Sequence, residues 1–255
     1  MGPALLVVVA HPDDETFGTG SVIAAAAVAG ARVVVCCATR GEAGEDTSGT
    51  TTSAEELARV REAELRAAAA VLGADEVVLL DFADSGLNGA MPDRALAAVD
   101  LEEVVAQLVP VIQRVQPDVV VGLDPESVND HRDHMRIGLA TDLAFERAAK
   151  PTARLYHWTL VRSMMNEWFA KMRAQGLLEA YTDIEMGIED EKITTIIDVA
   201  HVMDQRRAAI AEHRTQASPF SGLDAEFEHS LLARDHLVRV VPSWDGAPIE
   251  SSLFD

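Results

Sequence analysis

From residue 4 to residue 124 the chain repeats one pattern, in which a short apolar run alternates with a longer segment of helical periodicity. The apolar runs are 4–10 (ALLVVVA), 31–38 (ARVVVCCA), 76–82 (EVVLLDF) and 118–124 (DVVVGLD). Short runs that are apolar at nearly every position are typical of strands buried on both faces. The segments between them, 18–30, 53–73 and 100–116, carry apolar residues at helical spacing.

Strands that alternate with helices in this way are joined by right-handed crossovers and form a parallel sheet. We therefore predict an α/β fold, with a Rossmann-like, mainly parallel sheet and helices on both faces. The helix over 53–73 has a capping box, with Ser53 followed by Glu56, and Gly73 at its expected end. In such sheets ligands bind at the carboxyl ends of the strands.

The second half of the chain is less regular. Runs 154–161 and 193–200 are predicted to be strands and 202–216 a helix. In the segment 163–181, Met164, Trp168 and Met172 share one helical face, which suits a core or subunit interface, or the wall of a substrate channel. We expect a single domain over 1–255, with an α/β core and metal site in 1–150. Residues 151–255 would be a C-terminal elaboration that completes the pocket, and a homo-oligomer stays open.

The charge and the cysteines limit the partners and the compartment. A formal charge of −21 over 255 residues repels phosphate and anionic lipid, so we expect neither nucleic-acid nor membrane binding. The only cysteines, Cys36 and Cys37, point to opposite faces of a strand and cannot readily pair. They provide no disulfide framework and too few thiolates for a cysteine zinc site. With no basic n-region at the N-terminus, we expect a cytoplasmic protein.

The segment AHPDDE at 10–15 directly follows the first predicted strand. In a tight turn stiffened by Pro12, His11 and Asp14 are spaced to converge on one point while Asp13 faces elsewhere. Imidazole and carboxylate are common ligands of divalent cations, and a cation would relieve repulsion among the three acids. The alternative is a structural turn whose acids cap the next helix.

The segment NDHRDHMRIG at 129–138 follows the predicted strand 118–124. Its His131 and His134 lie one turn apart on a helix predicted over 131–149, so both imidazoles share a face. His134 can complete a His–Asp–His set with the first segment, leaving open positions as in a catalytic zinc site. His131 would then stand near the metal, and Asp133 would orient a histidine. Two unrelated surface histidines are the alternative.

Taken together, these motifs resemble those of the PIG-L/LmbE-like metal-dependent de-N-acetylases, which act on N-acetylglucosaminyl compounds and related amides. The similar segments are AHPDDE (10–15), RGEAGE (40–45), REAEL (61–65), DSGL (84–87), HRDH (131–134), HRTQ (213–216) and the closing LFD. The resemblance spans almost the whole chain.

The resemblance implies a role for each matching residue. The metal ligands would be His11, Asp14 and His134, holding Zn²⁺ or, with the same ligands, Fe²⁺. Asp13 would be the general base, and His131 a second catalytic group. The family's substrate contacts fall on Arg61 and Asp84. Asn129 stands where some members have a tyrosine that helps to stabilise an oxyanion, and Arg132 where proline is common.

The predicted activity is hydrolysis of an N-acyl, most simply N-acetyl, amide on an N-acetylglucosamine-type small molecule. A metal acidifies water and polarises the amide oxygen, while Asp13 accepts the proton. His131 would stabilise the oxyanion if protonated, or act as the acid. The alternatives are a non-haem Fe(II) oxygenase with the same triad, a nucleotide-binding module at Gly18 and Gly20, and a non-catalytic metal-binding module.

Overall fold

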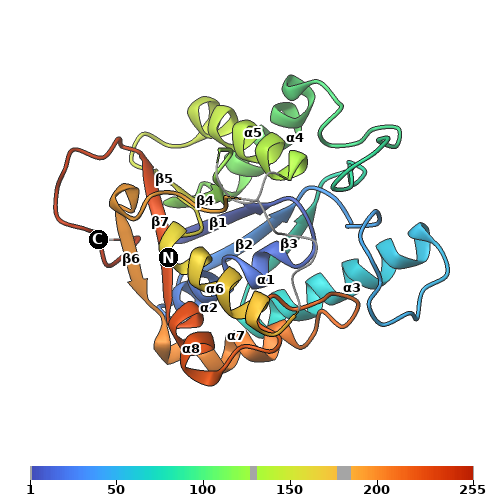
Figure 1. The fold of residues 1–255 in the computed structure, drawn as a ribbon. Coiled ribbons are helices and arrows are strands. Elements are labelled where there is room, and N and C mark those ends of the chain that lie inside the picture. The colour runs from blue at the N-terminus through green and yellow to red at the C-terminus, as the bar shows by residue number, and fades with distance from the viewer. Residues whose placement is uncertain (1, 127–130, 177–184, 255) are drawn as a thin grey trace.

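The computed structural model describes residues 2–126, 131–176 and 185–254. Its centre is a seven-stranded sheet in the order β3-β2-β1-β4-β5-β7-β6 (Figure 1). The first five of these strands are parallel, while β7 runs antiparallel to both β5 and β6. The predicted α/β class with a mainly parallel sheet is confirmed.

The strands of the N-terminal half are nearly as predicted, and their apolar side chains form the core on both faces. The strands of the whole sheet, in chain order, are β1 (Ala4–Val9), β2 (Arg32–Cys37), β3 (Glu76–Leu79), β4 (Val119–Leu123), β5 (Arg154–Trp158), β6 (Thr195–Asp198) and β7 (Arg234–Val241). Valine and leucine at almost every position suit strands whose two faces are both covered by helices.

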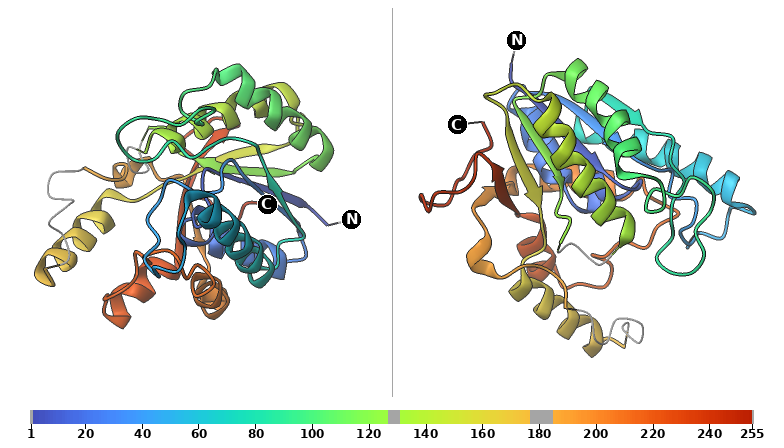
Figure 2. Two further views of the ribbon diagram at one scale, coloured as in Figure 1. Left: turned by 90° about the vertical axis from the view of Figure 1, so that its right-hand side faces the viewer. Right: turned by 90° about the horizontal axis from the view of Figure 1, so that it is seen from above.

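Helices cover both faces of the sheet, with α4 and α5 on one side and α2, α3 and α7 on the other (Figures 1 and 2). The helices are α1 (Asp14–Phe17), α2 (Gly20–Val28), α3 (Ala54–Leu72), α4 (Leu101–Val115), α5 (Arg132–Ala148), α6 (Arg162–Ala174), α7 (Met203–Ile210) and α8 (Ala225–Leu232), with 3₁₀ turns at Asp190–Lys192 and Ala200–Val202. As predicted, Ser53 caps α3 by accepting the backbone N–H of Glu56, and Gly73 ends it with a left-handed φ.

The C-terminal half differs from its prediction in two respects. The helix expected over 202–216 ends at Ile210, because the chain turns there to bring 213–216 against the loop that follows β1. Strand β7 and helix α8 were not predicted, and β7 lies between β5 and β6. These strands extend the sheet of the N-terminal half without starting a second one.

The strand order explains why two distant loops meet. The chain goes outward from β1 to β2 and β3, then returns to place β4 on the other side of β1. The carboxyl ends of β1 and β4 therefore flank the switch point where α/β sheets bind ligands. Helix α5 approaches β4 closely, since a Cβ on Gly138 would lie 2.6 Å from the carbonyl oxygen of Leu123.

Two smaller expectations concern the cysteines and the membrane. Cys36 and Cys37 are both free and buried in the sheet. Among the described residues, no helix combines the length and the apolar character needed to span a bilayer.

Candidate metal centre

The loop that leaves β1 carries His11, Pro12 and Asp13 and runs directly into α1, which begins at Asp14. The Asp14 carboxylate folds back on this loop: its Oδ2 accepts the backbone N–H groups of Ala10 at 3.2 Å and His11 at 2.9 Å. Burial opposes ionisation of Asp14, yet the neighbouring His134 and His11 hold its pKa well below the usual range. Asp14 is thus a fixed, ionised carboxylate.

Donor atoms of three residues from the two motifs converge. His11 Nδ1 lies 3.3 Å from His134 Nε2 and 3.5 Å from Asp14 Oδ2, and His134 Nε2 lies 3.2 Å from Asp14 Oδ1. Ligands bonded to zinc at 2.0–2.1 Å in a tetrahedron are ~3.3 Å apart. The spacing of these atoms and their chemistry therefore fit one divalent cation.

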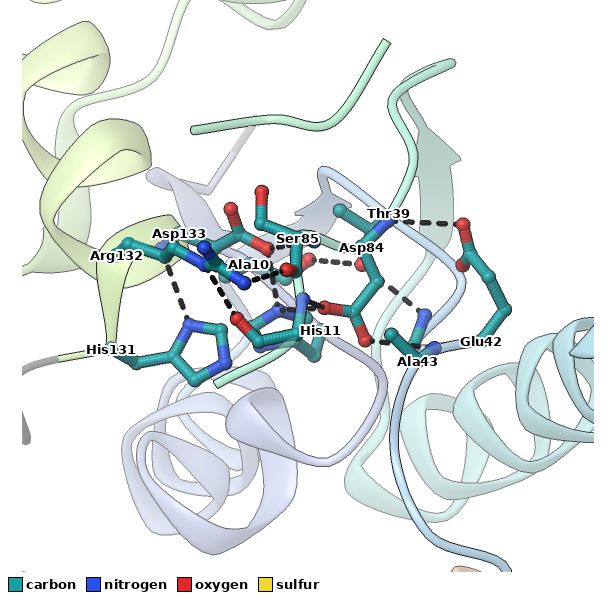
Figure 3. Close-up of polar contacts among 12 residues, drawn as sticks. Ala10, His11, Thr39, Glu42, Ala43, Asp84, Ser85, His131, Arg132 and Asp133 are labelled. Atoms are coloured by element: carbon teal, nitrogen blue, oxygen red, sulfur yellow. Dashed lines mark hydrogen bonds and ion pairs between the residues drawn. The ribbon is translucent and has the colours of Figure 1, made fainter. Parts of the chain in front are cut away.

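The other face of His11 is held by carboxylates (Figure 3). His11 Nε2 donates to Asp133 Oδ2 at 3.1 Å and lies 3.5 Å from Asp84 Oδ1. This contact places the proton on Nε2 and leaves Nδ1 as a ligand. Asp133 has the position that the sequence predicted for a residue orienting a histidine.

His11, Asp84 and Asp133 form a second cluster whose donor atoms lie within 4.8 Å of one another. Backbone N–H groups already occupy three of its four carboxylate oxygens: Asp133 Oδ2 accepts from Ser85, and the Asp84 oxygens accept from Gly86 and Ala43. Asp133 Oδ1 has no hydrogen-bond partner among the described residues. Oxygens that are engaged in this way suit the support of a histidine better than direct coordination of an ion.

Replacing Asp133 with asparagine is expected to weaken metal binding by about 10–100-fold, the usual effect of losing an outer partner of a metal-bound histidine. The amide keeps the shape but removes the charge that orients His11. Competition with a chromogenic chelator measures the affinity. Unchanged affinity would mean that the contact between His11 and Asp133 does not support the site.

His131 is the N-cap of α5 and points toward His11 and His134. The centroid of its ring lies 4.6 Å from that of the His11 ring and 5.0 Å from that of the His134 ring. Its Nδ1 accepts the backbone N–H of Asp133 at 3.2 Å, which leaves the proton of the neutral ring on Nε2. Burial, followed by the charges of His11 and His134, lowers the pKa of His131 to about 4. This favours a neutral donor over the protonated form considered from the sequence.

Asp13 has an unusual backbone, with φ of 129° and ψ of −34°. This conformation is rare for any residue with a Cβ, and such strain concentrates at functional sites. Burial, reinforced by the adjacent Asp14, raises the pKa of Asp13 to about 8. The Asp13 side chain lines a cavity beside the converging donor atoms, so a base at this position is held at a cost in folding free energy.

The strain predicts an inverted order of stability for two variants without the carboxylate. Asp13→Gly should be more stable than Asp13→Ala by about 1–2 kcal/mol, since glycine accepts the positive φ. At a residue with a negative φ, the glycine variant would be less stable than the alanine variant by about 0.5–1 kcal/mol. Urea unfolding of the two metal-free variants measures the difference, and the ordinary order would refute the strain.

A buried pair that the sequence analysis missed supports Asp13. The Glu15 carboxylate accepts the backbone N–H of Asp13 at 2.9 Å and contacts His213 Nε2 at 2.7 Å, and both side chains of the pair are fully buried. Although burial opposes its charge, Glu15 raises the pKa of His213. Gln216 also donates to the carbonyl oxygen of Pro12 at 2.6 Å. His213 therefore lies behind the metal loop and does not border the cavity.

Arg206 holds the end of helix α1, which follows the loop after β1. This role was likewise not predicted. Its guanidinium donates to the carbonyl oxygens of Thr16 and Gly18 at the end of α1 and forms a buried ion pair with Asp235 at 3.3 Å. A helix as short as α1 is not stable in isolation, so contacts with the C-terminal half of the chain hold it in place.

The predicted substrate contacts lie around the centre in different ways. Arg61 is buried, and its two terminal nitrogens donate to the carbonyl oxygens of Gly41 at 2.7 Å and Glu45 at 2.8 Å. A Cβ on Gly44 would lie 2.4 Å from this guanidinium, so the glycine admits the arginine. Neither Arg61 nor Asp84 is among the described residues that line the cavity. Their contact with substrate stays a prediction, and Asn129 falls outside the described residues.

Arg132, which replaces a common proline, has a clear structural role. Its guanidinium donates to the carbonyl oxygen of Ser85 (Figure 3) and to those of Gly86 and Gly89. It thereby ties the loop after β3 to the start of α5, next to Asp133.

A cavity of about 480 Å³ opens beside the centre. Asp13, Asp14, His131 and His134 line one part of it, and methionine and aromatic side chains line another. Within α6, Met164, Met165 and Trp168 border the cavity, while Phe169 and Met172 are buried behind them. The predicted methionine and tryptophan stripe is thus partly cavity wall and partly core.

Comparison with known proteins agrees with this geometry. Residues 6–145 match the family model PIG-L, described as GlcNAc-PI de-N-acetylase. The chain belongs to the PIG-L family. This confirms the resemblance drawn from the sequence and the hydrolytic de-N-acetylase class that it implied.

Relatives in the PIG-L family include a 1D-myo-inositol 2-acetamido-2-deoxy-alpha-D-glucopyranoside deacetylase of Rhodococcus jostii (strain RHA1). It is 34% identical, over 92% of this chain and 91% of the relative. A protein of the same description from Acidothermus cellulolyticus is 33% identical, over 98% and 94%. These named activities concern small-molecule amino sugars, in line with the predicted kind of substrate.

Solved structures show the fold. The N,N'-diacetylchitobiose deacetylase of Pyrococcus horikoshii has a TM-score of 0.64 at 21% identity, covering 93% of this chain and 83% of that one. The 4-carboxy-2-hydroxymuconate hydratase of Pseudomonas putida KT2440 has a TM-score of 0.66 at 20% identity, covering 96% and 99%. A hydratase thus shares the fold of this PIG-L protein. The function of the present chain therefore has to be argued from its site and not from its fold.

Proposed function

We propose that this PIG-L protein is a metal-dependent hydrolase that removes an acyl group, most simply acetyl, from the nitrogen of an N-acetylglucosamine-type small molecule. The single observation that carries the proposal is the meeting of His11 Nδ1, Asp14 and His134 Nε2 within 3.2–3.5 Å, beside a cavity that also contains Asp13. The named activities of the relatives supply the class of substrate.

Each residue of the site has a role in this reaction. His11, Asp14 and His134 would hold Zn²⁺, with Fe²⁺ as the alternative for the same ligands. When bound, the ion would acidify water and polarise the amide oxygen. Asp13 would accept the proton of the attacking water and deliver it to the leaving amine. Neutral His131 would donate its Nε2–H to the oxygen that becomes negatively charged.

The strongest rival activities are an Fe(II) oxygenase and a hydratase on the same architecture. The positions of Asp13 and His131 favour hydrolysis, because a base and a hydrogen-bond donor beside the metal are what amide cleavage requires. Free buried thiols suit the reducing cytoplasm, which we retain as the expected location.

Release of acetate and of free amine is the decisive measurement. The protein loaded with Zn²⁺ or, without oxygen, with Fe²⁺ is incubated with a panel of N-acetyl amino sugars that includes 1D-myo-inositol 2-acetamido-2-deoxy-α-D-glucopyranoside. Equal amounts of acetate and amine are expected. Oxygen uptake with a 2-oxo acid, or hydration of an enol acid without amide cleavage, would replace the proposal with one of the rival activities.

A further inference from the structure

The peptide group between Pro12 and Asp13 is held at both of its polar atoms. Its carbonyl oxygen accepts a hydrogen bond from Gln216 Nε2 at 2.6 Å. Its N–H donates to Glu15 Oε2 at 2.9 Å. One partner follows directly in the N-terminal motif and the other comes from the C-terminal half, so two distant parts of the chain fix the orientation of this one peptide plane. We call Glu15 and Gln216 the Asp13 clamp.

The peptide group that follows Asp13 is held as well. The Asp13 carbonyl oxygen accepts the backbone N–H groups of Thr16 at 2.9 Å and Phe17 at 2.7 Å, both in α1. The angles φ and ψ of a residue are the rotations of its two flanking peptide planes about the Cα atom. With both planes fixed, Asp13 has to adopt the φ of 129° that residues with a Cβ otherwise avoid.

Glu15, the first member of the clamp, is itself fixed. Its second carboxylate oxygen accepts from His213 Nε2 at 2.7 Å and from the Thr16 hydroxyl at 2.5 Å. The side chains of Glu15 and His213 are fully buried. Moving the carboxylate would leave buried polar groups unpaired, which costs free energy. Glu15 is therefore a rigid acceptor for the Asp13 N–H.

Gln216, the second member, is placed by its neighbour in the chain. Thr215 donates its backbone N–H and its hydroxyl to the Glu64 carboxylate at 3.0 and 2.6 Å, and Glu64 is buried on α3. The Thr215 carbonyl oxygen accepts the backbone N–H of Thr47 at 2.9 Å. The backbone beside Gln216 is thus fastened to α3, and the glutamine side chain extends from there to Pro12.

The orientation of the clamped peptide decides where Asp13 points. Asp13 lies between His11 and Asp14 in the chain, and its φ sets the direction of its carboxylate relative to the backbone that carries His11. In the observed conformation the Asp13 side chain borders the cavity. A strained backbone persists only where the surrounding contacts over-determine it, and the clamp supplies such contacts.

We propose that Gln216 is a positioning residue for the general base: together with Glu15 it holds the peptide that aims the Asp13 carboxylate into the cavity. This inference rests on the proposed function and adds a residue to its machinery. Among the described residues, those that line the cavity do not include Gln216, and its amide donates to Pro12. Gln216 therefore acts on the reaction through Asp13 alone.

Gln216→Met tests the clamp, because it keeps the length of the side chain and removes the donor. We expect kcat for amide hydrolysis to fall at least about tenfold, since a small misplacement of a catalytic group can cost about 10²-fold. KM should stay within about twofold of the wild-type value, as for the loss of an interaction that serves the transition state only. Zn²⁺ content should not change. An unchanged kcat, or loss of the metal, would overturn the inference.

Gln205→Met is the matched control. Gln205 is also half-buried, and its Nε2 donates to the carbonyl oxygen of Val71 at 2.7 Å, so it likewise joins the C-terminal half to the N-terminal half. This bond lies between α7 and α3 and does not involve the loop after β1. The control should keep the wild-type kcat. An equal fall in both variants would mean that any loosening between the halves lowers activity, and would overturn the inference.

Urea unfolding separates failure of this inference from failure of the proposed function. If the clamp imposes the positive φ, its removal allows the backbone of Asp13→Ala to relax, so Asp13→Gly loses its advantage in stability. Adding Gln216→Met to both variants should reduce the difference between their urea midpoints by at least about half, whereas adding Gln205→Met should preserve it. The full-length variants are compared at saturating Zn²⁺.

A midpoint difference that Gln216→Met leaves unchanged would overturn the inference, whatever the enzyme assay shows. A reduced difference supports the clamp even if no amide in the panel is cleaved, and in that case only the proposed function fails.

Discussion

Replacing Asp13 with asparagine is expected to lower kcat for amide hydrolysis by about 10²–10⁴-fold, the contribution of a well-placed general base. The substitution preserves the size of the side chain but removes its ability to accept a proton. Asp13 is not one of the three residues whose donor atoms meet, so metal content should stay close to that of the wild type. Steady-state kinetics and metal analysis of the same sample measure both quantities.

Asp93→Asn is the matched control for that experiment, because Asp93 is an exposed acid outside the cavity. Its kcat should equal that of the wild type. If Asp13→Asn retained near-normal turnover, Asp13 would not be the base. If it lost the metal, Asp13 would be a ligand and the set of three would need revision.

Replacing His134 with alanine is expected to remove most of the bound metal and, with it, nearly all activity. One of the three proposed ligands is lost, and the remaining pair, His11 and Asp14, comes from a single segment of the chain. Breaking the link between the two loops should weaken metal affinity by far more than the about 10–100-fold expected for an outer partner. Metal stoichiometry after dialysis measures the effect.

His229→Ala serves as the control here, since His229 is exposed on α8 and should leave the stoichiometry unchanged. Treating the wild type with a chelator should likewise abolish activity, and adding back Zn²⁺ or Fe²⁺ separately shows which ion restores it. A wild-type metal content in His134→Ala would mean that the two motifs do not share one ion.

Much of the N-terminal half could be predicted, because a strand covered on both faces leaves an uninterrupted apolar run. β7 was missed for the opposite reason: charged residues interrupt its sequence, RDHLVRVV, and one of them, Asp235, is buried in an ion pair with Arg206. Its place between β5 and β6 is set by pairing across the sheet, which the order of elements along the chain does not reveal.

The meeting of the two histidine motifs could be predicted because each motif is short and lies at the end of a strand. The support for Asp13 could not be predicted in the same way, since Glu15 and His213 are 198 positions apart. The positive φ of Asp13 could not be predicted from its residue type, because positive φ angles are usually found at glycine. Likewise, only the structure shows that Arg132 holds the loop after β3.

The dependence of the loop after β1 on distant residues bears on how this enzyme can be divided. A fragment ending at residue 145, where the family match stops, would contain His11, Asp14 and His134, yet it would lack Arg206, His213 and Gln216. The catalytic fragment and its scaffold are therefore not separable modules. Grafting the two histidine motifs onto another parallel sheet would transfer the ligands without the brace that keeps them aligned.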